Sequence, residues 1–140
     1  MSTDAMREQV LAANRRFYDA LESLDMGQME AVWDTGGAAA CVHPGSAWQR
    51  GWEEVRAGWE AIMASTGYIE FEIREARADI VDPVAWVTCI ERITSSGPQG
   101  PSVADVAATN VFVLDATGWH LTVHHASPVI RPAPAPAPAE

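Results

Sequence analysis

The chain contains no lysine. Its nine basic residues are all arginine, and they stand against nineteen aspartates and glutamates, which gives a formal net charge of −10 at pH 7. A protein that binds a polyanion needs a basic face, because its contacts with phosphate come from cationic side chains. The shortage of positive charge therefore argues against nucleic acid as a partner. We attribute the absence of lysine to genomic base composition rather than to function.

The chain has only two cysteines and no long apolar run. The two cysteines, Cys41 and Cys89, form no CxxC motif and both fall in predicted strands, so we expect free buried thiols rather than a disulfide. No apolar run approaches the roughly twenty residues that a membrane-spanning helix needs. The first residues are polar and precede an amphipathic helix, which is not the pattern of a signal peptide. These absences predict a cytoplasmic protein with no membrane partner.

Hydrophobic periodicity predicts helices first and strands afterwards. Apolar residues recur at helical spacing over residues 4–24, over a short segment that ends at Trp33, and over 52–64. A short strand, 38–42, separates the second helix from the third. Alternation with period two predicts four further strands, at 69–74, 84–94, 103–114 and 119–126. This order is typical of an α+β fold in which helices cover one face of an antiparallel sheet.

The length of 140 residues suits one domain, to which we assign residues 1–128. Residues 129–140 consist largely of alternating proline and alanine. Such a segment cannot join a sheet, so we expect an extended, solvated tail.

Two predicted strand ends carry imidazole close to proline. His43 precedes Pro44 at the end of the first strand, and His124 and His125 come shortly before Pro128 at the end of the last. Strand ends on a sheet that curls round a cavity bring side chains together at a ligand. Histidine exchanges protons near neutral pH, so we take His43 as the candidate general base. The alternative is an imidazole that only hydrogen-bonds a loop carbonyl at the mouth of a pocket.

Four features, in this order and spacing, carry a resemblance to a known family. They are the segment 17–25, the strand ending at His43-Pro44, the pair Gly51 and Val55, and the closing hairpin 108–121. Together they resemble the nuclear transport factor two superfamily, in particular its ketosteroid-isomerase-like and SnoaL-like branches. The resemblance implies a cone-shaped, strongly curved antiparallel sheet, with three N-terminal helices enclosing a deep pocket. It also implies homodimers that form through the outer sheet face.

The resemblance further suggests which positions carry chemistry. The position of the ketosteroid isomerase base falls on His43, that of its phenol on Phe17, and that of its protonated carboxyl on Asn110. Phenylalanine has no proton to donate, whereas the amide of Asn110 can still donate a hydrogen bond. Tyr18 lies about 100° further round the helix, so we expect no substitute for the missing phenol.

Alternation along the closing hairpin predicts which side chains face the pocket. If Asn110 and Phe112 face inward, the pairing puts Val123 and His125 on the same face, and His124 on the outer face. Asn110 and His125 would then polarise a ligand oxygen. The alternative is that these two side chains bond each other or backbone groups.

Aromatic residues complete the predicted pocket, with Trp33 and Trp86 in its wall and Trp48 as a lid. The alternative for Trp48 is ordinary packing against the rest of the protein. The expected lining is Phe17, Trp33, Trp48, Trp86, Phe112 and Val123. A metal site made from His43, Glu91 and His125 matches no ligand motif, so we expect no metal. No cofactor is expected either.

Two functions stay open at this point. The first is a protein that binds a small, mostly apolar molecule, with His43 as general base in isomerisation, dehydration or hydrolysis. The second is a non-catalytic binding or dimerisation module built on the same cone. The fold alone does not decide between them, because this architecture serves unrelated functions.

Overall fold

Within residues 2–130, the part of the chain that the computed structural model describes, the order of three helices and six strands follows the predicted pattern. The elements are α1 (Thr3–Ser23), α2 (Met26–Val32), β1 (Ala40–Val42), β2 (Gln49–Arg50), α3 (Trp52–Ser65), β3 (Tyr68–Val81), β4 (Val84–Gly97), β5 (Gly100–Asp115) and β6 (Gly118–Pro128). The α+β class is confirmed, and β2 is an additional strand in a segment predicted as a loop. Most of the predicted tail, residues 131–140, lies outside the described residues.

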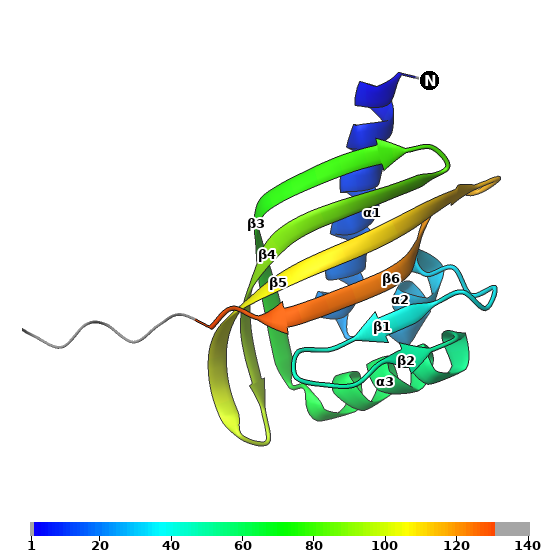
Figure 1. The fold of residues 1–140 in the computed structure, drawn as a ribbon. Helices are drawn as coiled ribbons and strands as arrows, with labels where there is room; N and C mark the ends of the chain where they lie inside the picture. Colours follow the sequence, from blue (N-terminus) through cyan, green and yellow to red (C-terminus); the bar gives the residue numbers. More distant parts are fainter. Residues whose placement is uncertain (1, 131–140) are drawn as a thin grey trace, which may run out of the picture.

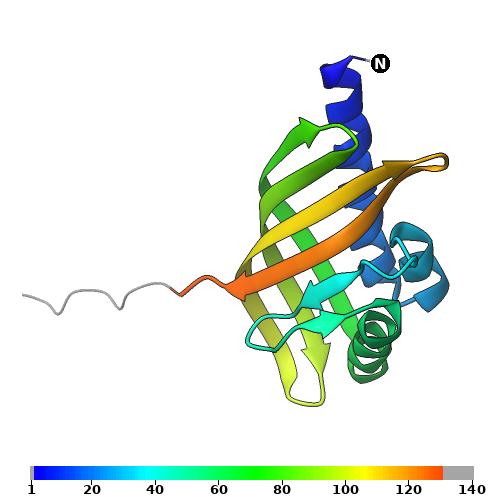
Figure 2. The same ribbon diagram turned by 45° about the vertical axis from the view of Figure 1, so that its right-hand side comes forward.

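The strands form one curved sheet in the order β2-β1-β6-β5-β4-β3. Neighbouring strands are antiparallel except β1 and β6, which run parallel. The long strands curve round α1, and α2 and α3 lie at the end of the sheet that carries β1 and β2 (Figures 1 and 2). The parallel pairing sets Cys41 beside His124 and Val42 beside His125. The end of β1, from which His43 follows, therefore lies next to the two histidines of β6.

Helix α1 lies in the curve of the sheet and is buried over a wide arc. Ser2 caps its first turn by accepting a hydrogen bond from the backbone N–H of Ala5 at 3.1 Å. The buried residues of the helix are Val10, Ala13, Asn14, Phe17, Tyr18, Ala20 and Leu21. Adjacent residues such as Phe17 and Tyr18 are both buried because α1 contacts β3 and β4 on one side and α2 on the other.

A β-bulge in β6 changes the alternation of its side chains. Val111 of β5 pairs with Val123, but the next residue, Phe112, pairs with Leu121, so Thr122 is an extra residue on β6. One extra residue moves every later side chain of the strand to the opposite face.

The prediction that Val123 and His125 face inward is therefore wrong. Asn110 pairs with His124, and Thr109 pairs with His125. His124 is only 3% exposed, whereas His125 is exposed on the outer face. The histidine that joins Asn110 on the inner face is thus His124.

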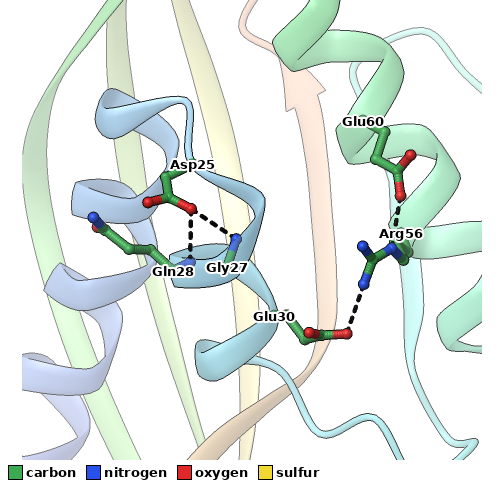
Figure 3. Close-up of polar contacts among 6 residues, drawn as sticks. All are labelled: Asp25, Gly27, Gln28, Glu30, Arg56 and Glu60. Carbon is green, nitrogen blue, oxygen red and sulfur yellow. Dashed lines mark hydrogen bonds and ion pairs between the residues drawn. The ribbon is translucent and has the colours of Figure 1, made fainter.

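The short helix α2 is held by its N-cap and by an ion pair to α3 (Figure 3). Asp25 accepts hydrogen bonds from the backbone N–H groups of Gly27 at 2.8 Å and Gln28 at 3.4 Å. Arg56 of α3 reaches across to Glu30, with a nitrogen–oxygen distance of 2.7 Å. The cap stabilises the first turn of α2, and the ion pair joins α2 to α3.

Replacing Asp25 by alanine is expected to lower the free energy of unfolding by about 1 kcal/mol, because two backbone N–H groups lose their acceptor. Asp25→Asn keeps a capping oxygen and should change stability by only a few tenths of that amount. Urea unfolding of the three proteins measures the difference. An equal loss in both variants would show that the charge of Asp25, and not its cap, stabilises α2.

Candidate functional site

A cavity of about 130 Å³ lies on the concave side of the sheet, between α1, α3, β3, β4 and β6. Its lining consists of Leu21, His43, Pro44, Trp59, Ile62, Ile69, Phe71, Glu91, Ile93, His124 and Ala126. Most of the wall is apolar, and His43, Glu91 and His124 are its titratable residues. An apolar cavity of about 150 Å³ in another protein holds benzene. The cavity therefore suits a ligand of about one six-membered ring.

A larger hollow of about 430 Å³ lies on the outer face of the sheet, over β4, β5 and β6. Its polar side chains include those of Glu75, Thr88, Thr109 and His125, all of which are exposed. Active sites collect buried titratable groups with altered pKa values, whereas Glu75 and His125 in this hollow are exposed. The smaller inner cavity is accordingly the better candidate for chemistry.

His43 lines the inner cavity directly after β1. Its ring packs edge-on against Trp59, with 4.6 Å between centroids, and lies 6.4 Å from the ring of His124. Burial lowers the pKa of His43, and the neighbouring Gln49 side chain offsets part of this effect. The imidazole is therefore neutral at pH 7 and can accept a proton. Its Nε2 is 3.7 Å from Sγ of Cys41, whose pKa burial raises to about 12, so that thiol is no nucleophile at neutral pH.

Glu91 of β4 is the second titratable residue of the wall and is only 3% exposed. The phenol of Tyr18 donates a hydrogen bond to its Oε2 at 2.5 Å. Burial raises the pKa of Glu91 to about 7, although the hydrogen bond from Tyr18 acts in the opposite direction. A carboxyl with this pKa exchanges its proton near neutral pH.

Asn110 links Tyr18 to His124 through buried hydrogen bonds. Its Nδ2 donates to the hydroxyl of Tyr18 at 3.0 Å and to Oδ1 of Asn14 at 2.8 Å, and its Oδ1 is 2.5 Å from Nδ1 of His124. Burial, together with the neighbouring His43 and His125, lowers the pKa of His124 to about 3. Asn110 thus bonds protein groups that support the cavity and does not itself line it.

The expectation that α1 supplies no phenol is wrong. Tyr18 is fully buried and reaches Glu91, because the concave sheet covers both its own position and that of Phe17. Phe17 points toward the other helices and β6, with its ring 5.7 Å from that of Trp59 and 4.9 Å from that of His124. It belongs to the core behind the cavity rather than to the cavity wall.

The remaining predicted lining residues lie elsewhere. Trp33 and Phe112 are buried in the core but do not line the cavity. Trp86 is half-buried and faces the outer side of β4, since it alternates with buried neighbours. Trp48 is 43% exposed, and its ring lies 5.2 Å from that of His125 rather than over His43. Neither Trp86 nor Trp48 is therefore part of the inner cavity.

Within residues 2–130, no three His, Cys, Asp or Glu side chains lie close enough together to hold a metal ion. The set considered from the sequence does not assemble, because His125 faces away from His43 and Glu91. None of the helices in the described part of the chain is long and apolar enough to cross a membrane.

A known sequence family matches most of the chain. The SnoaL-like domain family matches residues 10–131. The chain therefore belongs to the SnoaL-like family, within the nuclear transport factor 2-like fold that the sequence resembled.

Solved structures support the same assignment. A protein of the nuclear transport factor 2-like family from Streptomyces avermitilis, provisionally named a dehydratase, is 37% identical with a TM-score of 0.87; the match covers 93% of this chain and 100% of that one. A provisionally named calcium/calmodulin-dependent protein kinase type II association domain from Thiobacillus denitrificans is 30% identical with a TM-score of 0.76. This match covers 85% of this chain and 94% of that one.

A curated relative, F-box protein SKIP8 from Arabidopsis thaliana, is 24% identical over 123 residues. The match covers 88% of this chain and 51% of that protein, so the chain spans about half the length of this relative. The names of these similar proteins describe different functions, because one fold can carry unrelated sites.

Proposed function

We propose that this chain binds a small, mostly apolar molecule in the inner cavity and that His43 acts on it as a general base. The observation that carries the proposal is the meeting of His43, Glu91 and His124 on the wall of an otherwise apolar cavity. Such a cavity excludes water from the ligand, which strengthens electrostatic interactions with the few polar groups present. The ligand is about as large as one six-membered ring, because the cavity is close in volume to one that holds benzene.

His43 and Glu91 have different roles in the proposed reaction. Neutral His43 accepts a proton from carbon or from water, and Glu91, with a pKa of about 7, returns a proton to the ligand. Isomerisation, dehydration and hydrolysis all need such an exchange and no redox cofactor. The likeness to the Streptomyces avermitilis protein, provisionally named a dehydratase, favours dehydration.

In a dehydration, His43 removes a proton from the carbon next to the one that bears the hydroxyl. The electrons of that C–H bond form the carbon–carbon double bond as the C–O bond breaks. The hydroxyl leaves as water with the proton from Glu91. His43 then holds the proton that restores the acid for the next turnover.

Substituting His43 by alanine is expected to slow turnover strongly while leaving the fold intact. Tryptophan fluorescence, to which Trp59 in the cavity wall contributes, would detect binding of single-ring enolisable ketones, phenols, lactones and epoxides. Turnover of any compound that binds wild type is expected to fall about 100-fold in His43→Ala, the lower end of the contribution of a general base. The matched control is His125→Ala, because His125 lies outside the cavity. Equal loss of turnover in the control would rule out a specific role of His43.

A second candidate, an association module, is favoured by the 30% identity to the association domain from Thiobacillus denitrificans. Its surface would be the outer sheet face with the 430 Å³ hollow, through which we propose that two copies pair. Sedimentation velocity of wild type and Thr109→Arg, a change in the middle of this face, tests self-association. Self-association without binding of any compound in the screen would favour the module over the enzyme.

A further inference from the structure

Tyr18 sets the direction of the buried hydrogen bonds behind the cavity. Its single phenolic proton goes to the carboxyl of Glu91, so its oxygen is left to accept from Nδ2 of Asn110. The same Nδ2 donates to Oδ1 of Asn14. With the amide nitrogen of Asn110 on this side, its carbonyl oxygen faces His124.

The orientation of Asn110 determines which ring nitrogen of His124 carries the proton. An amide oxygen can only accept, so Nδ1 of His124, 2.5 Å away, is the donor. A neutral imidazole has one N–H, which leaves Nε2 as an acceptor. Burial keeps the ring neutral, since it lowers the pKa of His124 to about 3. Among the described residues, Nε2 has no hydrogen-bond partner, although His124 lines the cavity.

We propose that the cavity selects a ligand that carries a hydroxyl group, and that this hydroxyl donates its hydrogen bond to Nε2 of His124. The inference rests on the proposed function, because it takes the inner cavity as the place where the ligand binds. His124 is then the residue that determines ligand specificity, and Tyr18 and Asn110 are positioning residues that hold it in the accepting tautomer. A hydroxyl held in this way also fits the substrate of a dehydration, which must contain one.

A carbonyl compound of the same size is a poorer ligand for this wall. Its oxygen can only accept, so it leaves Nε2 of His124 unpaired inside the protein. The indole N–H of Trp59 is a buried donor without a partner among residues 2–130, but its nitrogen is enclosed by protein and is not on the cavity surface. The other donors available to a carbonyl are His43 and the protonated form of Glu91, both of which the proposed proton transfer uses.

Cyclohexanol and cyclohexanone, which share a ring and differ at the oxygen, test the inference. Cyclohexanol is expected to bind about tenfold more tightly to wild type, which corresponds to one hydrogen bond gained and one acceptor left unpaired. In His124→Phe, which keeps a ring but has no acceptor, the ratio should fall to about twofold or less. In the matched control His125→Phe, one residue along on the outer face, the tenfold ratio should remain.

The tautomer of His124 can be measured without any ligand. In wild type labelled with ¹⁵N-histidine, a two-bond ¹H–¹⁵N correlation spectrum should show Nδ1 protonated and Nε2 unprotonated at His124, and protonated Nε2 would overturn the inference by itself. Equal affinity for the two rings would overturn it as well, while the proposed function stands. Binding of neither ring would overturn both.

Discussion

The Glu91→Gln variant is expected to be more stable than wild type by about 3 kcal/mol at pH 8 and equally stable at pH 4. Burial raises the pKa of Glu91 from 4.5 to about 7 in the folded protein. Below pH 4.5 the carboxyl is protonated in both the folded and the unfolded state, so its burial does not lower the free energy of unfolding. As the pH rises from 4.5 to 7, the unfolded chain loses this proton before the folded protein does, so stability falls. Glutamine has no charge to bury and still offers Tyr18 an acceptor.

Urea unfolding of both proteins at the two pH values measures this difference. The matched control is Glu8→Gln on α1, because Glu8 is exposed and its replacement should change stability little at either pH. Equal stability of wild type and Glu91→Gln at pH 8 would mean that Glu91 ionises in the folded protein as easily as in water. A buried carboxylate that destabilises the fold at neutral pH is typical of a functional residue, since nothing in packing requires it.

The fold could be predicted from periodicity because each element has a clear period over many residues. Period two along 69–74 and helical spacing along 52–64 correspond to β3 and α3. The location of His43 could be predicted as well, because it depends on a strand end next to proline and not on side-chain detail. The pairing of β2 with β1 was missed, since a strand of two residues leaves no periodic signal.

The faces of β6 could not be predicted, because a bulge leaves no mark in the sequence. Thr122 is an ordinary strand residue, and nothing in its type marks the register shift between Val111 and Phe112. One extra residue was enough to exchange His124 and His125. The alternation therefore assigns the inner face to His125, whereas His124 occupies it.

Alternation along β4 is a sequence signal that Glu91 faces the inside of the protein. Glu91 shares a strand face with Val87 and Cys89, both buried, so alternation puts a carboxyl among apolar side chains. The sequence argument against Tyr18 is its position about 100° round the helix from Phe17. A concave sheet buries a wider arc of the helix, and the depth of that curvature depends on the whole sheet rather than on the helix sequence.

Acidification from pH 7 to pH 3 is expected to destabilise Glu91→Gln by about 4 kcal/mol more than it destabilises the double variant Glu91→Gln/His124→Gln. Burial lowers the pKa of His124 from 6.5 to about 3 in the folded protein. Above pH 6.5 the ring is neutral in both states. As the pH falls below 6.5, His124 binds a proton in the unfolded chain but stays neutral in the folded protein until about pH 3. Stability is therefore lost over this range.

The Glu91→Gln background is needed because Glu91 conceals the effect in wild type. Between pH 4.5 and 6.5 its stability change has the opposite sign and similar size, so the two contributions largely cancel. Urea unfolding at pH 3, 5 and 7 resolves the remaining dependence, and ionisable groups common to both variants cancel in the comparison. If the two variants lose the same stability, the folded protein protonates His124 as readily as the unfolded chain does. Below pH 6.5 Nε2 would then be a donor, and at that pH the cavity would favour carbonyl compounds over alcohols.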